Sequence, residues 1–194
     1  MAGRGSRMVT GPVTSREPRV TADPGTGSLP SQARRSGSRR HPVRRLSRHF
    51  TLDELIASQT AARHGIDNTP SPAVVRNLRR LAALLEKIRG LLGGTPILVG
   101  SGYRCRALNA AVGGAAASAH MAGLAADFTA PGYGTVLQVA QKIAASRLRY
   151  DQLIFEYGAW VHVGLAPGRR KARRQNLSIF KGTGYLDGIV TQPA

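Results

Sequence analysis

The sequence lacks several features that would assign it to a common class of protein. Its 194 residues include one cysteine, and aromatic residues make up 5% of the chain. A single cysteine excludes an internal disulfide framework and a cysteine-based zinc finger, each of which needs several. No apolar run approaches the roughly 18 residues of a membrane-spanning helix. The first 30 residues lack the apolar core of a secretory signal. We therefore expect a protein made in the cytoplasm without a visible export signal.

Acidic residues are also scarce, with 10 Asp and Glu against 28 Lys and Arg and a net charge of +18. Such an excess by itself suggests binding to nucleic acid or another anionic surface. The remainder of the chain after residue 48 has few aromatics and no signature of an RNA- or DNA-binding motif, so we expect no specific nucleic-acid partner. The length is that of one ordinary domain with a tail.

The cations are concentrated at the N-terminus. Residues 1–48 hold 11 Arg, opposed by Glu17 and Asp23, and are otherwise rich in Gly, Ser, Pro and Thr. Without periodic apolar residues this segment cannot bury enough surface to offset its ordering entropy, so we predict disorder. Its Arg pairs are either solvated or contact phosphate or lipopolysaccharide-like anions. A second basic run at 169–174 is either a solvated loop or a surface that holds an anionic polymer. Residues 183–194 are predicted to be a C-terminal tail.

From Phe50 onward the pattern is that of a folded domain. Thr51 to Glu54 forms a capping box, which predicts a helix start, and a longer helix opens at Ser71 and ends at the glycines 93–94. Further elements are predicted as a buried strand at 96–99, a helix at 104–112, a strand at 124–128, a helix at 135–146, and strands at 151–156 and 160–164 joined by a hairpin. Helices that precede strands favour an α+β fold.

The residues that could bind a metal or take part in catalysis lie between Ser101 and His162. His120 and Asp127 are seven residues apart, and Asp127 sits in an apolar stretch where an unpaired carboxylate is costly. Strand alternation places Trp160 and His162 on one face. Two His and one carboxylate leave a fourth position open, as in a catalytic zinc site. On spacing alone each residue also fits a simpler role, as a core histidine, a turn residue or a loop residue.

These motifs resemble the zinc D-Ala-D-Ala carboxypeptidase family, and its small bacterial and phage members in particular. The resemblance rests on Ser101-Gly-Tyr-Arg104, Ser118-x-His120-x-x-Gly123-x-Ala125-x-Asp127 and Trp160-x-His162, supported by Phe50-Thr-Leu-Asp-Glu-Leu, Gly65-Ile-Asp-Asn-Thr-Pro70, Leu108-Asn-Ala-Ala-Val-Gly-Gly114 and Asp151-Gln-Leu-Ile154. It covers residues 49–180 and implies the hedgehog/D,D-peptidase fold. We therefore expect a domain at 49–182 with a small antiparallel sheet, packed against helices, that carries the zinc site.

The resemblance also implies roles for single residues. His120, Asp127 and His162 would bind one Zn²⁺ per chain. Arg104 would steady the substrate and the oxyanion, and a fixed cation at such a site is suited to that role. Ser118 would line the site and contact substrate, although a serine here can equally cap a turn.

The implied reaction is hydrolysis of D-amino-acid-containing stem peptides of peptidoglycan by a metal-activated water. Tyr103 and Trp160 are candidate walls for the peptide, or partly buried core residues. The scissile bond stays open between D-Ala-D-Ala, L-Ala-D-Glu (an endolysin-type endopeptidase) and a cross-bridge. A catalytically inactive, zinc-containing peptide-binding module is a further alternative. The expected site of action is the cell wall or periplasm, or a phage-associated one.

The position of the candidate general base differs from that in the better-known family members, which carry an acid three residues before the last zinc histidine. Here that position is Ala159, and the nearest acid is Glu156. A tight turn at 157–159 would set Glu156 opposite Trp160 and on the face of His162. Asp151 is a rival but falls on the opposite face by alternation. We predict Glu156 as the base; the alternative is a strand-end residue paired with an Arg.

Overall fold

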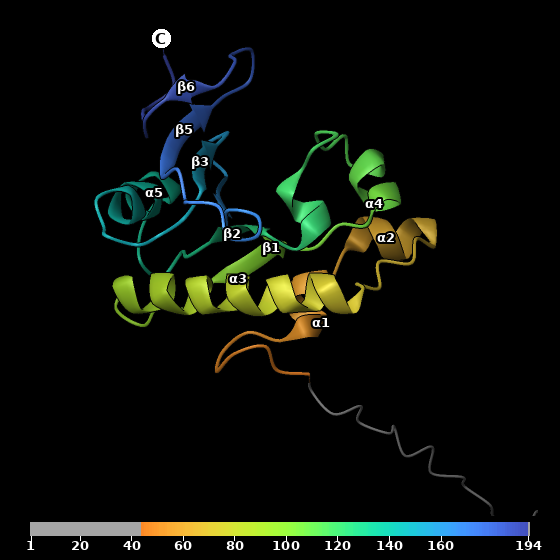
Figure 1. Ribbon diagram of the computed structural model, residues 1–194. Helices are drawn as coiled ribbons and strands as arrows, with labels where there is room; N and C mark the ends of the chain where they lie inside the picture. The colour runs from red at the N-terminus through yellow and green to blue at the C-terminus, as the bar shows by residue number, and fades with distance from the viewer. Residues whose placement is uncertain (1–43, 194) are drawn as a thin grey trace, which may run out of the picture. The chain divides into compact units, whose positions relative to one another are not determined.

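A computed structural model describes residues 44–193, so most of the segment predicted to be disordered lies outside the described residues. Its elements, in chain order, are α1 (Leu52–Ile56), α2 (Gln59–His64), α3 (Pro72–Leu91), β1 (Leu98–Ser101), α4 (Arg106–Ala111), the 3-10 helix η1 (Ala119–Ala122), β2 (Ala125–Thr129), α5 (Val136–Ala144), β3 (Gln152–Glu156), β4 (Trp160–Gly164), β5 (Gln175–Ile179) and β6 (Leu186–Asp187) (Figure 1). The predicted α+β class is confirmed. Within the described range no helix is long and apolar enough to cross a membrane.

Polar side chains define where the helices begin. The hydroxyls of Thr51, Ser58, Ser71 and Thr135 each accept a hydrogen bond from a backbone N–H in the first turn of α1, α2, α3 and α5. Such caps satisfy amide groups that have no partner inside the helix. The predicted starts at Thr51, Ser71 and Thr135 are therefore confirmed.

The sheet has six strands in the order β1-β2-β4-β3-β5-β6. Neighbouring strands are antiparallel except β3 and β5, which run parallel. The expectation of a small antiparallel sheet is therefore wrong in part, because β5 passes β4 and pairs with the far edge of β3. The mixed polar sequence of β5 gives no alternating pattern, so neither β5 nor β6 was predicted.

Strand β1 also differs from expectation. It spans Leu98–Ser101 rather than 96–99, and it lies at the edge of the sheet with an irregular register between Val99 and Ser101. Its side chains are not fully buried, and Leu98 is 56% exposed. An edge strand has a neighbour on one side alone, which explains the exposure.

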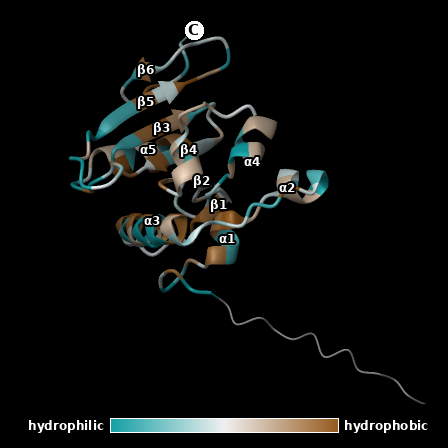
Figure 2. Ribbon diagram, turned by 45° about the vertical axis from the view of Figure 1, so that its right-hand side comes forward, coloured by the Kyte–Doolittle hydropathy of each residue, from teal (hydrophilic) through white to brown (hydrophobic). Residues whose placement is uncertain are grey.

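The two faces of the sheet have different roles. One face contributes buried apolar side chains that pack with the apolar side of α3 and with α5, namely Ala126, Phe128, Leu153, Phe155, Val161 and Val163. Figure 2 shows the corresponding hydrophobic residues in the strands and α1, and alternating hydrophobic and polar residues along α3. The opposite face carries Asp127, Glu156 and His162. The core is thus built on one side of the sheet and the candidate site on the other.

The folded domain begins before the predicted boundary at residue 49. Leu46 packs against the core, and the Ser47 hydroxyl donates to Glu86 Oε1 of α3 at 2.7 Å. The backbone N–H of His49 donates to the same oxygen, and its ring lies 2.8 Å from Glu86 Oε2. Burial raises the pKa of Glu86, but these hydrogen bonds outweigh it and lower the pKa to about 2. Residues 44–48 are therefore part of the domain.

The predicted C-terminal tail is also partly structured. Strand β6 pairs with β5, and the Ser178 hydroxyl donates to Gly188 O and accepts from the Val190 N–H, both at 2.9 Å. Ser178 is completely buried, so these bonds satisfy a hydroxyl that would otherwise be costly. Residues 183–190 thus close the sheet beyond β5.

Candidate metal centre

Three elements bring the predicted metal ligands together. Asp127 of β2 and His162 of β4 are directly paired across the sheet, and His120 comes from η1. The chain passes from η1 into β2 through Gly123, which has φ +65°. A Cβ at this position would lie 2.8 Å from Val74 Cγ1 of α3. Glycine is therefore required both by the left-handed backbone and by the close approach of α3.

The donor atoms converge on one point. Asp127 Oδ1 lies 2.8 Å from His162 Nδ1 and 3.1 Å from His120 Nε2, and the two ring nitrogens are 3.2 Å apart. All three residues are buried. Ligand atoms of a tetrahedral zinc at 2.0–2.1 Å are about 3.3 Å from one another. The spacing and the donor types therefore fit one zinc ion.

The hydrogen bond made by Nδ1 fixes which ring nitrogen of His120 is protonated. His120 Nδ1 lies 2.6 Å from the Gly102 carbonyl oxygen, which can only accept, so Nδ1 carries the proton. Burial is the main cause that lowers the pKa of His120, which favours the neutral ring. Nε2 then faces Asp127 and His162 with a lone pair. Lone pairs that converge in a buried place are stabilised by a shared cation.

Arg104 holds the other oxygen of Asp127. One Nη of Arg104 donates to Asp127 Oδ2, and its Nε donates to the Ser101 hydroxyl at 2.7 Å. Burial raises the pKa of Asp127, but its contacts with His120 and His162 outweigh this and lower the pKa well below the usual range. Asp127 is therefore ionised, with one oxygen toward the imidazoles and the other toward Arg104.

Supporting residues that sequence reasoning left without a role keep these groups in place. Gly102 has no room for a side chain, because a Cβ would collide with the Leu55 carbonyl. Asn68 Nδ2 donates to Tyr103 O, and Asn68 Oδ1 accepts from the Cys105 N–H. Cys105 itself caps α4, since its sulfur accepts from the Leu108 N–H at 3.4 Å. Both Gly102 and Asn68 lie in segments that support the family resemblance, Ser101-Gly-Tyr-Arg104 and Gly65-Ile-Asp-Asn-Thr-Pro70, but the sequence did not show what either residue contacts.

Glu156 lies where the turn geometry predicted. It is paired with Trp160 across β3 and β4, and the Trp160 indole N–H donates to Glu156 Oε2 at 3.0 Å. The turn between the strands contains Tyr157 with φ +55° and Gly158 with φ +69°. Burial is the main cause that raises the pKa of Glu156. A base role for Glu156 stays a prediction, while its position beside His162 on the site face is observed.

Asp151, the rival acid, is bound by another residue. Arg173 donates to its two carboxylate oxygens from Nε and Nη at 2.6–3.2 Å, and the Arg173 backbone N–H adds a bond of 3.0 Å. These hydrogen bonds are the main cause that lowers the pKa of Asp151. Within the 169–174 run, Arg174 also has structural partners: it lies 5.2 Å from the Tyr150 ring centroid and donates to the carbonyls of Ala144, Ser146 and Leu148. Arg173 thus pairs with Asp151 while its side chain stays exposed, and Arg174 is partly buried with several structural partners, so the solvated-loop interpretation does not hold for Arg174.

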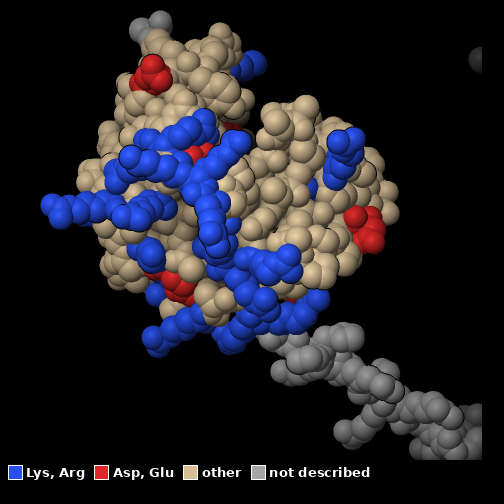
Figure 3. Space-filling view, viewed as in Figure 1, with Lys and Arg blue, Asp and Glu red and all other residues tan. Residues whose placement is uncertain are grey.

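The metal group lies in a cleft of about 1210 Å³. Figure 3 shows the molecule hollowed between the part that carries β5 and β6 and the part that carries α4. The cleft brings together the remaining predicted site residues, which are Tyr103, Arg104, Ser118, Glu156 and Trp160. Ser118 also caps η1, and Tyr103 is 9% exposed and belongs to the core. Each thus combines a structural role with a place at the cleft.

Two further aromatic residues of the cleft were missed, Tyr157 and Tyr185. Tyr157 adjoins Glu156 in the predicted hairpin, so its place was within reach of the strand argument. Tyr185 precedes β6, which has no recognisable sequence pattern.

The buried His/Asp/His group lies in a cleft on the site face of an α+β fold and could hold a metal ion, an arrangement that suits a metallopeptidase. The family model of Peptidase M15 matches residues 48–164, and the chain belongs to this family. Peptidases of this family are zinc-dependent, in agreement with the donor set. A search of curated proteins finds no match to the chain.

Proposed function

We propose that the protein hydrolyses D-amino-acid-containing stem peptides of peptidoglycan with one bound zinc, in a reaction of the D-Ala-D-Ala carboxypeptidase type. The observation that carries the proposal is the convergence of His120 Nε2, Asp127 Oδ1 and His162 Nδ1 on the face that also holds Glu156. Membership of Peptidase M15 supports the peptidase activity, and the motif resemblance supports the substrate class. The cell wall is the corresponding site of action.

The chain's residues would hold the metal and fix its surroundings. Zinc, when bound, polarises a carbonyl and lowers the pKa of a coordinated water. The Gly102 carbonyl orients the His120 ring, and Arg104 orients the Asp127 carboxylate. The second Nη of Arg104 has no partner in the described part of the chain and supplies a donor for a developing oxyanion.

Glu156 would move the proton. One carboxylate oxygen, Oε2, is held by the Trp160 indole, which leaves Oε1 to accept a proton from the attacking water. The same oxygen then delivers this proton to the nitrogen of the leaving amine. Burial raises the pKa of Glu156 toward the working pH, which suits a group that must both take and release a proton.

Cleavage inside the stem, at L-Ala-D-Glu, is a second candidate that one observation favours. A carboxypeptidase needs a cation for the terminal carboxylate of its substrate. Arg63, Arg104 and Arg173 reach the cleft, but Arg173 pairs with Asp151, and Arg104 pairs with Asp127 and uses its second Nη for the oxyanion. Arg63 would then have to bind the terminal carboxylate, although its guanidinium already donates to Gln59. This lack of a dedicated cation among the described cleft residues favours cleavage inside the stem.

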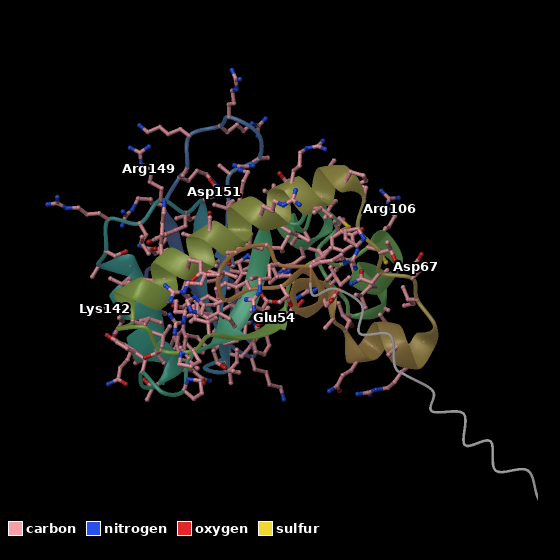
Figure 4. All side chains as sticks on the ribbon, turned by 90° about the horizontal axis from the view of Figure 1, so that it is seen from below. Glu54, Asp67, Arg106, Lys142, Arg149 and Asp151 are labelled. Carbon is pink, nitrogen blue, oxygen red and sulfur yellow. The ribbon has the colours of Figure 1, made fainter. Side chains whose placement is uncertain are left out.

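An anionic cell-wall polymer is the expected second contact of the protein. Exposed cations of α3 and of the segment before β5 lie side by side, because Arg80 donates to the carbonyls of Ala166 and Gly168. Figure 3 shows Lys and Arg spread over this face, and Figure 4 shows the further cations Lys142 and Arg149. A broad basic surface attracts phosphate-rich polymers through long-range electrostatics that salt screens.

The test is digestion of purified muropeptides by the zinc-loaded protein, with products identified by mass. Release of D-alanine identifies the carboxypeptidase, and fragments cut after L-alanine identify the endopeptidase. Glu156→Gln should retain zinc and lose about 10²–10⁴-fold in turnover. Glu54→Gln is the matched control, because burial also raises the pKa of Glu54, which lies on α1 outside the cleft. No product from the zinc-loaded wild type would contradict the proposal and favour a binding module.

A further inference from the structure

We propose that Tyr157, Trp160 and Tyr185 form an aromatic wall that binds a sugar ring of the glycan strand to which the peptide substrate is attached. The proposal rests on the proposed function for its substrate class and adds a saccharide subsite to the peptide site. The wall lies at the Glu156 end of the cleft, and all three side chains line the cleft.

Two of the three aromatic residues, Tyr157 and Trp160, are in contact, and the third lines the same cleft. The ring centroids of Tyr157 and Trp160 are 5.6 Å apart with an interplanar angle of 57°. Tyr185 lines the same cleft as Glu156, Tyr157 and Trp160. Burial is the main cause that raises the pKa of Tyr185, and the charges of Glu156 and Tyr157 add to it. Tyr157 and Tyr185 are 50% and 62% exposed, so the wall has a free surface toward the cleft.

This exposure is unusual for the chain. Most other aromatic side chains of the described part are buried, among them Phe50, Tyr103, Phe128, Tyr150, Phe155 and Phe180. Grouped aromatic surface that a soluble protein leaves uncovered commonly marks a binding site.

The backbone at Tyr157 supports a role for its ring. A φ of +55° suits glycine or asparagine, and a bulky side chain there is an outlier. The Tyr157 N–H donates to the Ile179 carbonyl at 2.8 Å, which ties this strained residue to β5. Strain of this kind persists where the surroundings enforce it and concentrates at functional sites.

A sugar fits the wall better than more peptide does. The C–H face of a pyranose ring is apolar and packs flat on an aromatic ring, whereas the side chains of a stem peptide are small or charged. The cleft, at about 1210 Å³, also exceeds the roughly 300–1,000 Å³ of a pocket for one small ligand. Space therefore remains for a sugar beyond the peptide that crosses the metal group.

The single tryptophan of the chain, Trp160, allows a binding test that does not require catalysis. The probe is the peptide-free N-acetylglucosamine–N-acetylmuramic acid disaccharide, titrated against the full chain while tryptophan fluorescence is recorded. We expect a saturating change in the wild type. Tyr185→Ala and Tyr157→Asn should weaken binding by about three- to tenfold, as expected for loss of one aromatic contact.

Tyr133→Ala is the matched control, because Tyr133 is 37% exposed but does not line the cleft; its affinity should equal that of the wild type. Asparagine tolerates the left-handed backbone, so Tyr157→Asn should melt no lower than the wild type. Absence of a saturating signal in the wild type, or equal affinities in the wall variants, would overturn the proposal. Disaccharide binding by a protein that cleaves no muropeptide would support the sugar subsite and contradict the peptidase proposal.

Discussion

Two buried carboxylates, Asp127 of β2 and Asp151 just before β3, have similar burial and different surroundings. Their exposed fractions are 8% and 9%, and the pKa of each is lowered. Asp151 is surrounded by N–H donors of a single residue, Arg173. Asp127 faces two imidazole rings with one oxygen and a guanidinium with the other.

The difference shows that partner chemistry, rather than burial, distinguishes a structural carboxylate from a metal ligand. A guanidinium can only donate, so its pair with Asp151 is complete and fastens the segment before β5 to the sheet. Imidazole nitrogens also carry lone pairs, so the group around Asp127 is complete when a cation joins it.

The largest expected effect is a difference in peptide hydrolysis between variants of the two carboxylates. Asp127→Asn should abolish peptide hydrolysis, because two remaining ligands hold zinc poorly. Asp151→Asn should change turnover little, because its side chain contacts Arg173 and not the metal group. Initial rates on one muropeptide at equal protein concentration measure both. Comparable losses in the two variants would erase the distinction between the carboxylates.

The next effect is on stability. Asp151→Asn should lower the free energy of unfolding by about 1–3 kcal/mol, because it weakens hydrogen bonds to a buried charge. The folded pKa of Asp151 lies below its unfolded value, so its contribution is present above the unfolded pKa and is lost as pH falls through the folded one. Urea unfolding at neutral pH and at low pH tests the sign. A penalty that stays constant down to the lowest pH would contradict the assignment.

A smaller effect is expected at the N-terminal boundary. Deletion of residues 1–43 should leave the melting temperature and peptide turnover unchanged, because this part of the chain has no periodic apolar residues. Deletion of residues 1–48 removes Leu46 and the Ser47 bond to Glu86 and should cost about 1–2 kcal/mol. Glu86 has a folded pKa of about 2, so its stabilising contribution is lost as pH falls from its unfolded value toward 2. Equal melting curves for the two deletions would place the boundary at 49 after all.

The smallest effect concerns the basic surface. Lys171 is exposed, whereas Arg173 is paired with Asp151. Lys171→Gln should weaken binding to an anionic cell-wall polymer slightly, leave stability unchanged, and lose its effect at high salt. Cosedimentation with cell walls at two salt concentrations measures this. A weakening that persists at high salt would mean that the contact is not electrostatic.

Local patterns predicted much of the site. Strand alternation and the short turn at 157–159 placed Glu156 beside Trp160 and on the face of His162, as the structure has it. The capping residues Thr51 and Ser71 marked helix starts correctly, and the helix predicted over 135–146 starts after its first residue. These features depend on neighbours in the sequence, which is why they were predictable.

Features that depend on residues far apart in the sequence were not predicted. The parallel pairing of β5 with β3 requires a chain that returns past β4, and no local pattern encodes such a return. The bond of Arg173 to Asp151 joins residues 22 apart, and the bonds of Ser47 and His49 to Glu86 span nearly 40. Tyr185 reaches the cleft through the same unpredicted part of the sheet.

The most direct test of the central claim is the zinc content per chain of the purified wild type, Asp127→Asn and Asp151→Asn, measured by elemental analysis after extensive dialysis. One zinc per chain is expected in the wild type and in Asp151→Asn, and none in Asp127→Asn, because the donor atoms of His120, Asp127 and His162 form the site. Full zinc content in Asp127→Asn would contradict the assignment of this group as the metal centre.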